Sequence, residues 1–126
     1  MCIRDSYGER ALSRLPPDLV KAYFGPSVDS SRQLIKDLRE SVKFTQVNLV
    51  DSATTVAQGK FDIIFCRNVL IYFDDASRLG ASHNLYEALN PGGFICLGHS
   101  ESMARISDRF TVRRFDDAIV YQRPVP

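Results

Sequence analysis

Arg67 and Asn68 interrupt the apolar segment FDIIFCRNVLIYF at residues 61–73. A continuous apolar run of this kind is typical of a buried strand in a parallel sheet, with residues 61–66 as the strand. The guanidinium and the carboxamide then follow the end of that strand, where open α/β sheets bind ligands. The same pair could instead satisfy nearby backbone carbonyls or form half of an internal ion pair. The residues alone leave both interpretations open.

Other side chains capable of chemistry are scattered, and the common catalytic motifs are missing from the sequence. It has no nucleotide-binding glycine loop, no zinc-protease motif and no nucleophile elbow. The glycines of GGFICLG follow a predicted helix and enter a strand, which is the reverse of a phosphate-binding turn. His83 is expected to be a packed or surface residue, whereas His99 fits a structural or a functional role equally. Taken alone, Asn48 is expected in a turn and Tyr72 in packing.

The composition excludes several classes of protein. The chain has 126 residues, which suits one domain, and its net charge is only +1, so neither nucleic acid nor an anionic membrane is expected as the main partner. Cys2, Cys66 and Cys96 form no C-x-x-C pair, which favours free thiols in a reducing cytosol over a disulfide or zinc framework. No apolar run reaches the roughly 18 residues of a membrane span. No metal site is expected.

The first part of the chain predicts short elements. Pro17 and Asp18 suit the start of a helix, and Gly25 with Pro26 suits its end. Residues 32–49 are ambiguous, and we interpret them as a short strand, a helical turn and a second strand over about 42–49. The first six residues, MCIRDS, support no element and are interpreted as foreign or disordered.

The second part predicts a βαβ unit followed by a hairpin. The strand at 61–66 leads to a helix that Asp74 and Asp75 can cap, and NPGG ends this helix near Leu89 before a second apolar strand, FICLG. Such a unit is right-handed and parallel in nearly all cases. FTVRRF and AIVYQR, separated by two aspartates, then predict an antiparallel pair. The inner face of the helix is predicted to carry Leu79, Ser82 or His83, Tyr86 and Leu89.

FDIIFCRNVLIYFDD, followed by LNPGGFICLGHSESM, closely resembles the CheR-type chemotaxis receptor methyltransferases, which use S-adenosylmethionine. LPPDLVKAYF and FTQVNLVD resemble the same family in order and spacing. The resemblance covers about residues 7–121 and corresponds only to the later half of such an enzyme.

The resemblance implies an α/β fold, namely part of a class I (Rossmann-like) methyltransferase sheet that is mostly parallel and ends in an antiparallel hairpin. Residues 7–126 would be the C-terminal part of the methyltransferase domain, with a small inserted antiparallel subdomain over about 23–48. The family's first βαβ unit, with its cofactor loop, has no counterpart here, and the insert reads SSRQ where the family has glycine, tyrosine and arginine. We therefore interpret the chain as truncated, with negligible cofactor affinity alone.

The resemblance also implies the site residues. Asn48 and Leu49 would end a strand near the adenine of S-adenosylmethionine, and Arg67 and Asn68 would lie beside its methionine part. Arg67 and Tyr72 would be catalytic, near the transferred methyl group and the acceptor glutamate. A glutamate side chain is already ionised at neutral pH, so the expected role of Arg67 and Tyr72 is to position the acceptor glutamate and not to deprotonate it.

These implications lead to one main hypothesis and two alternatives. The main one is a cytoplasmic protein-glutamate O-methyltransferase that acts on chemotaxis receptors, with the receptor's C-terminal tail as a further docking partner. The first alternative is a non-catalytic module in which residues 20–50 bind a receptor tail and the sheet is a scaffold. The second, methylation of a small molecule on the same fold, is weaker because the RNVLIYFD stretch is so characteristic of the family.

Overall fold

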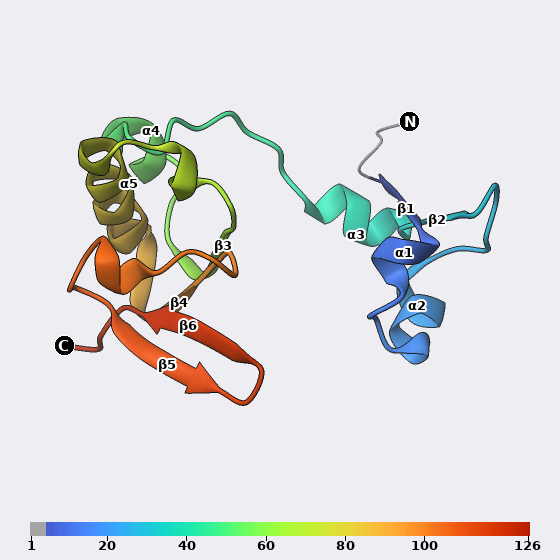
Figure 1. The fold of residues 1–126 in the computed structure, drawn as a ribbon. Helices are drawn as coiled ribbons and strands as arrows, with labels where there is room; N and C mark the ends of the chain where they lie inside the picture. The colour runs from blue at the N-terminus through green and yellow to red at the C-terminus, as the bar shows by residue number, and fades with distance from the viewer. Residues whose placement is uncertain (1–4) are drawn as a thin grey trace. The chain divides into compact units, whose positions relative to one another are not determined.

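A strand, a helix and a second strand form the centre of residues 46–126 in a computed structural model, which describes residues 5–126 of the chain. β3 (Phe61–Cys66) is followed by α5 (Asp75–Ala88), which leads directly into β4 (Leu89–Leu97). The two strands pair in parallel, from Ile63 opposite Phe94 to Cys66 opposite Leu97. The predicted βαβ unit is confirmed (Figure 1).

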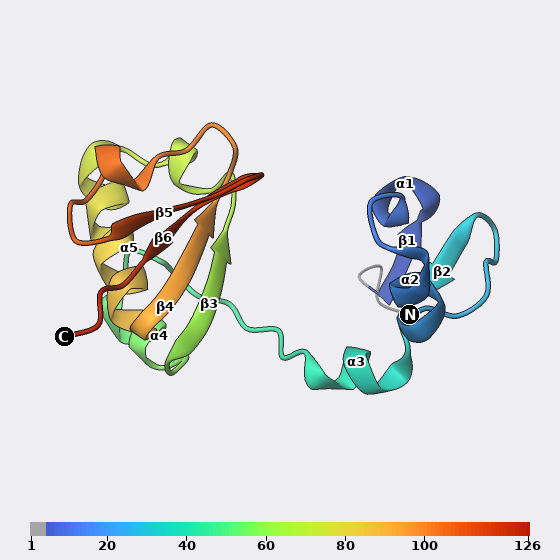
Figure 2. The ribbon, with the colours of Figure 1, turned by 90° about the horizontal axis from the view of Figure 1, so that it is seen from below.

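An antiparallel hairpin completes the sheet. β5 (Thr111–Phe115) and β6 (Ala118–Gln122) pair as predicted, and β6 also pairs antiparallel with β4. The strand order is therefore β3-β4-β6-β5, with α5 along one face (Figure 2). This mixed sheet, which ends in an antiparallel hairpin, agrees with the predicted fold class of a partial Rossmann-like α/β sheet.

α5 begins and ends where the sequence predicts, and of its predicted inner residues Ser82 and Leu89 are buried and Tyr86 packs against the core. The Asp74 carboxylate caps the helix by accepting a 2.7 Å hydrogen bond from the Ser77 N–H. The prediction that Leu79 lies on the inner face is wrong, since its side chain is 55% exposed. The buried apolar residues of the helix are Leu85 and the smaller Ala81 and Ala88, and Leu79 lies outside this face of the helix. Its buried residues are Ala81, Ser82, Asn84, Leu85 and Ala88.

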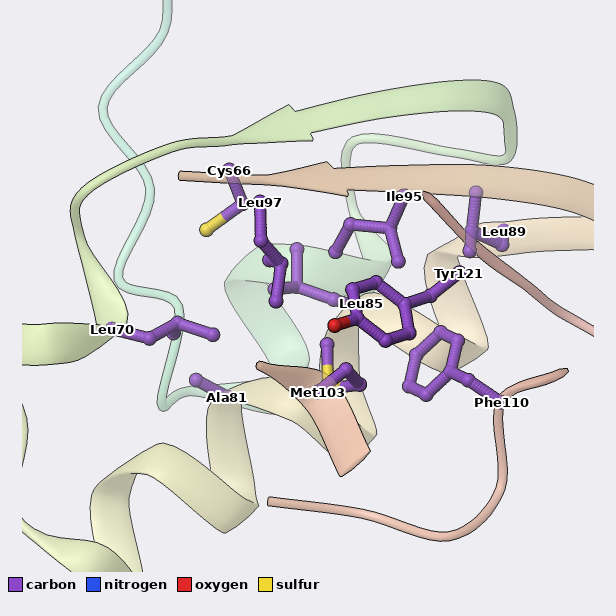
Figure 3. Packing of buried hydrophobic residues seen from close by; sticks show 10 residues of the cluster. All are labelled: Cys66, Leu70, Ala81, Leu85, Leu89, Ile95, Leu97, Met103, Phe110 and Tyr121. Atoms are coloured by element: carbon purple, nitrogen blue, oxygen red, sulfur yellow. The ribbon is translucent and has the colours of Figure 1, made fainter. Parts of the chain in front are cut away.

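The core lies between α5, the sheet and the connection from β4 to β5. Ile95 and Tyr121 come from neighbouring strands and meet Leu85 of the helix, with Met103 and Phe110 closing the far side (Figure 3). These side chains are buried, so they are removed from water on folding, and this burial is the main favourable contribution to the stability of this unit.

β3 is not the fully buried strand that the apolar run predicts. It lies at the edge of the sheet formed by the described residues, and Ile63 and Phe65 are 57% and 74% exposed. Because side chains alternate along a strand, these two point away from the face on which Cys66 is buried. Within residues 46–126, α5 packs on the face on which Cys66 is buried.

The other unit, which ends at Thr45, holds short elements. β1 (Ser6–Gly8) and β2 (Ser31–Gln33) pair antiparallel, and the unit also contains α1 (Glu9–Leu12), α2 (Pro17–Tyr23) and α3 (Lys36–Ser41). α2 starts at Pro17 as predicted. The prediction that residues 1–6 form no element is wrong at Ser6, which begins β1, and residues 1–4 lie outside the described residues.

The predicted strand over 42–49 is wrong. Residues 42–48 have no regular structure, and α4 (Ser52–Val56) begins a few residues later. Val42 and Phe44 alternate as in a strand, but both are exposed and neither has a strand partner in the described chain. Alternation alone cannot stabilise a strand without a neighbour to complete its hydrogen bonds. No helix in the described part of the chain is both long and apolar enough to cross a bilayer.

Candidate active site

The parallel strands β3 and β4 end side by side, because Cys66 and Leu97 are their last paired residues. Arg67 and Asn68 follow β3 directly, and Gly98 and His99 follow β4. We call these four residues the crest. The structure therefore places the two polar residues singled out in the sequence at the C-terminal edge of the sheet, where α/β folds bind ligands.

Arg67 is exposed and lines a hollow of about 740 Å³. Phe65, whose side chain is 74% exposed, also lines the hollow. Within residues 5–126 the guanidinium has neither a hydrogen bond nor an ion pair, which does not support the alternative of an internal ion pair. It is available for an anionic group. Further residues of the hollow are His99, Asp116, Asp117 and Ile119.

Asn68 is held by its backbone. Its φ is 58°, in the left-handed region that few side chains adopt, and asparagine is among those that do. Its N–H donates to Glu101 Oε2 at 2.7 Å, and the N–H of Gly98 donates to the same oxygen at 2.7 Å. Sequence reasoning missed Glu101. Its signal in the sequence was the GHSE stretch, which carries the family resemblance and whose last residue is Glu101.

Tyr72 stands on a short, well-anchored turn. It closes the 3-10 helix η2 (Leu70–Tyr72), in which Leu70 is buried in the core while Tyr72 is 82% exposed. Arg78 of α5 fixes this turn by donating to the carbonyls of Leu70 and Phe73 at 3.0 and 2.8 Å. The prediction that Tyr72 is a packing residue is wrong. No hydrogen bond joins its hydroxyl to another described residue.

Asn48 and Leu49 form a turn and do not end a strand. The Asn48 side chain accepts from the N–H of Val50 at 3.2 Å, as expected for an asparagine in a turn. Leu49 is partly buried, and its carbonyl accepts from the Asn84 side chain of α5 at 2.9 Å. The turn is therefore hydrogen-bonded to α5, the next helix after β3 and η2 in the chain. No described hydrogen bond joins the turn to Arg67 or Asn68.

Cys66 is not a nucleophile. Burial, with a smaller contribution from the nearby Glu101 carboxylate, raises the pKa of its thiol to about 11. The thiol is therefore protonated at neutral pH, and only the thiolate is reactive. Cys66 and Cys96 are both free, as predicted, and Cys2 lies outside the described residues.

Comparison with known families shows to which family the chain belongs. Residues 3–119 match the family described as "CheR methyltransferase, SAM binding domain". The chain belongs to this CheR family. The resemblance found in the RNVLIYFD and GHSE stretches is confirmed, and the family's cofactor is S-adenosylmethionine.

Several curated relatives of this CheR-family chain carry the name chemotaxis protein methyltransferase. Chemotaxis protein methyltransferase 2 of Vibrio cholerae is 50% identical over 118 residues, covering 94% of this chain and 41% of the relative. The Vibrio parahaemolyticus protein is 37% identical, with 97% and 44% covered, and Cher2 of Pseudomonas putida is 34% identical, with 96% and 44% covered. The chain thus spans less than half the length of these relatives.

The crest offers groups that suit the methionine end of S-adenosylmethionine, which carries a carboxylate. The Arg67 guanidinium has no hydrogen bond or ion pair within residues 5–126, and its five N–H donors can serve this carboxylate and a second acceptor. The exposed Phe65, which lines the same hollow, provides apolar contact area. The described residues thus fit one end of the cofactor, while the Asn48–Leu49 turn offers backbone groups at a second place.

Proposed function

We propose that this chain forms part of an enzyme that transfers a methyl group from S-adenosylmethionine to glutamate side chains of chemotaxis receptors. Membership of the CheR family supports the reaction class. The observation that carries the proposal to particular residues is the exposed, unpartnered Arg67 at the end of β3. In this proposal Arg67 and Tyr72 are the catalytic residues, and Asn48, Leu49, Arg67 and Asn68 hold the cofactor.

The reaction needs positioning more than proton transfer. A glutamate side chain has an ordinary pKa of about 4.3, so it is already a nucleophilic carboxylate at neutral pH. The cofactor, when bound, supplies an electrophilic methyl group on a sulfonium. Arg67 orients the acceptor carboxylate through its guanidinium, and Tyr72 donates a hydrogen bond from its phenol. A site closed to water strengthens both interactions.

The partners follow from the same proposal. The acceptor glutamates belong to the cytoplasmic part of the receptors, and the receptor's C-terminal tail is proposed as a docking partner. Two free thiols, Cys66 and Cys96, are in keeping with a reducing cytoplasm as the place of action. The names of the relatives support chemotaxis as the process.

The test uses a chimera in which residues 3–119 replace the matching segment of the Vibrio cholerae relative. With labelled S-adenosylmethionine and receptor-bearing membranes, the native chimera should methylate the receptor. Arg67→Ala should lower kcat by about 100-fold and Tyr72→Phe by about tenfold, since each removes a group that orients the acceptor. Arg105→Ala, at an exposed arginine of the 3-10 helix η3 (Met103–Arg105), is the matched control and should leave kcat unchanged.

Other outcomes separate the alternatives. If both site variants methylate the receptor as fast as the native chimera, the catalytic assignment is wrong. If the native chimera binds receptor-tail peptides but transfers no methyl group, the non-catalytic module is correct. Transfer to small carboxylates in place of receptors would indicate a small-molecule methyltransferase.

A further inference from the structure

One carboxylate oxygen joins the ends of two strands at the crest. Glu101 Oε2 accepts the N–H of Asn68 and the N–H of Gly98, each at 2.7 Å. Asn68 follows β3 and Gly98 follows β4, so the oxygen bridges segments that are 33 and 3 residues away from Glu101 in the sequence. Hydrogen bonds to a charged acceptor are short and strong, so this is an effective tie between the strands.

Asn68, Gly98 and Glu101 are packed so closely that position 98 has no space for a side chain. A Cβ atom on Gly98 would lie 2.1 Å from Oδ1 of Asn68 and 2.6 Å from Oε2 of Glu101, far inside normal contact distances. The Asn68 carboxamide therefore occupies the space that a side chain at position 98 would need. Its left-handed backbone, at φ 58°, persists only where the surroundings determine it. Glu101 and the bare Gly98 are those surroundings.

The second carboxylate oxygen of Glu101 is in an unfavourable environment. Oε1 is buried and has no hydrogen-bond partner among the described residues. A buried polar atom without a partner is unfavourable, and such atoms are rare in native proteins. The arrangement points to a role in setting the backbone of the crest.

We propose that Glu101 is a positioning residue for methyl transfer, an inference that rests on the proposed function. Its carboxylate fixes the backbone of Asn68, and Asn68 is bonded directly to Arg67. The tie therefore sets the direction in which Arg67 leaves the strand toward the hollow that it lines. Glu101 acts through these neighbours and does not itself meet the reacting atoms.

The first test measures the tie in the 126-residue chain. In Glu101→Ala, hydrogen exchange of the Asn68 and Gly98 amides should be at least tenfold faster, while the Ile95 and Tyr121 amides of the β4–β6 pair change less than twofold. Glu101→Asp keeps the charge, but its shorter side chain moves the carboxylate oxygens away from the N–H groups of Asn68 and Gly98. It should therefore behave like the alanine variant. Asp108→Ala removes an exposed acid from the same connection and should change none of these rates.

The second test measures the consequence in the Vibrio cholerae chimera. Glu101→Ala and Glu101→Asp should lower kcat by about 10- to 100-fold at temperatures where circular dichroism shows folded protein, because a small misplacement of an orienting group is costly. Glu101→Gln retains an oxygen that can accept both N–H groups, and it should restore most of kcat. A merely structural residue would change the melting temperature without this pattern.

The outcomes distinguish the two proposals. If the native chimera methylates receptors and Glu101→Asp has an unchanged kcat, the positioning role is wrong and the proposed function stands. If exchange at Asn68 and Gly98 is the same in all variants, the tie itself is refuted. If the native chimera transfers no methyl group although the amide exchange responds as expected, the proposed function fails.

Discussion

The Asn84 side chain donates a 2.9 Å hydrogen bond to the carbonyl of Leu49, 35 residues earlier in the chain. Asn84 is buried within α5, and Leu49 belongs to the turn that precedes α4. This hydrogen bond attaches the Asn48–Leu49 turn, which is proposed to bind the adenine, to α5. A buried carbonyl without its donor would be costly, so the bond explains why a polar residue lies on the inner face of α5.

Asn84→Ala should therefore lower the free energy of unfolding by about 1–3 kcal/mol, because it removes the hydrogen bond to the carbonyl of the partly buried Leu49. Urea unfolding followed by circular dichroism measures this change. Asn90→Ala is the matched control, since it removes an equally long 2.9 Å amide bond to Asp62 that is exposed. It should cost no more than about 0.5 kcal/mol. Equal losses in both variants would contradict the assignment.

Glu87 should make the unit formed by residues 46–126 less stable at acid pH. Its hydrogen bond from Arg109, at 3.0 Å, together with the charge of Arg123, holds the pKa of the carboxyl below its ordinary 4.5. Arg109 also lies over the Tyr86 ring and contacts His83 Nδ1. Because the folded pKa is the lower one, the stabilisation is fully present above about pH 4.5 and is lost as the pH falls through the folded value.

Melting temperatures measured from pH 7 to pH 3 test this. The native chain should be more stable than Glu87→Gln at neutral pH, and the difference should shrink below pH 4.5 as the carboxylate is protonated. Glu40→Gln, at an exposed i,i+4 pair with Lys36, should show almost no difference at any pH. A constant gap between native and Glu87→Gln across the range would contradict the prediction.

The uncovered side of β3 should make the chain associate with itself. Ile63 and Phe65 are 57% and 74% exposed on an edge strand, and exposed apolar edges pair with other chains. Ile63→Lys should reduce the associated fraction measured by analytical ultracentrifugation while leaving the melting temperature nearly unchanged. Leu97→Lys, at a buried position of β4, should unfold the protein instead. Association that is insensitive to Ile63→Lys would show that another surface is responsible.

The chain by itself should bind S-adenosylmethionine only weakly. Arg67 and Tyr72 are exposed, and no described hydrogen bond joins the Asn48–Leu49 turn to Arg67 or Asn68. We expect a Kd above about 1 mM, equivalent to less than about 4 kcal/mol of binding free energy. Isothermal titration calorimetry measures it, with S-adenosylhomocysteine as a second ligand. Micromolar binding would show that residues 5–126 form a complete cofactor site.

Several features of this protein are determined by the sequence alone. The βαβ unit, the cap of α5 at Asp74 and the hairpin around Asp116 and Asp117 are read from local patterns, because helix caps, apolar periodicity and turn residues act over a few positions. The RNVLIYFD and GHSE stretches also identify the family. Arg67 was recognised because a charged residue in an apolar segment is rare enough to stand out.

Only the tertiary structure decides which of these patterns are used. Val42 and Phe44 alternate like a strand but belong to no strand of the described residues, and β3 is apolar like a central strand but lies at the edge of the sheet that residues 5–126 form. Glu101 could not be recognised in advance, because its role depends on two N–H groups that come together only when β3 and β4 end at the same level. Local sequence sets what a segment can form, whereas burial and hydrogen bonding between distant segments set what it does.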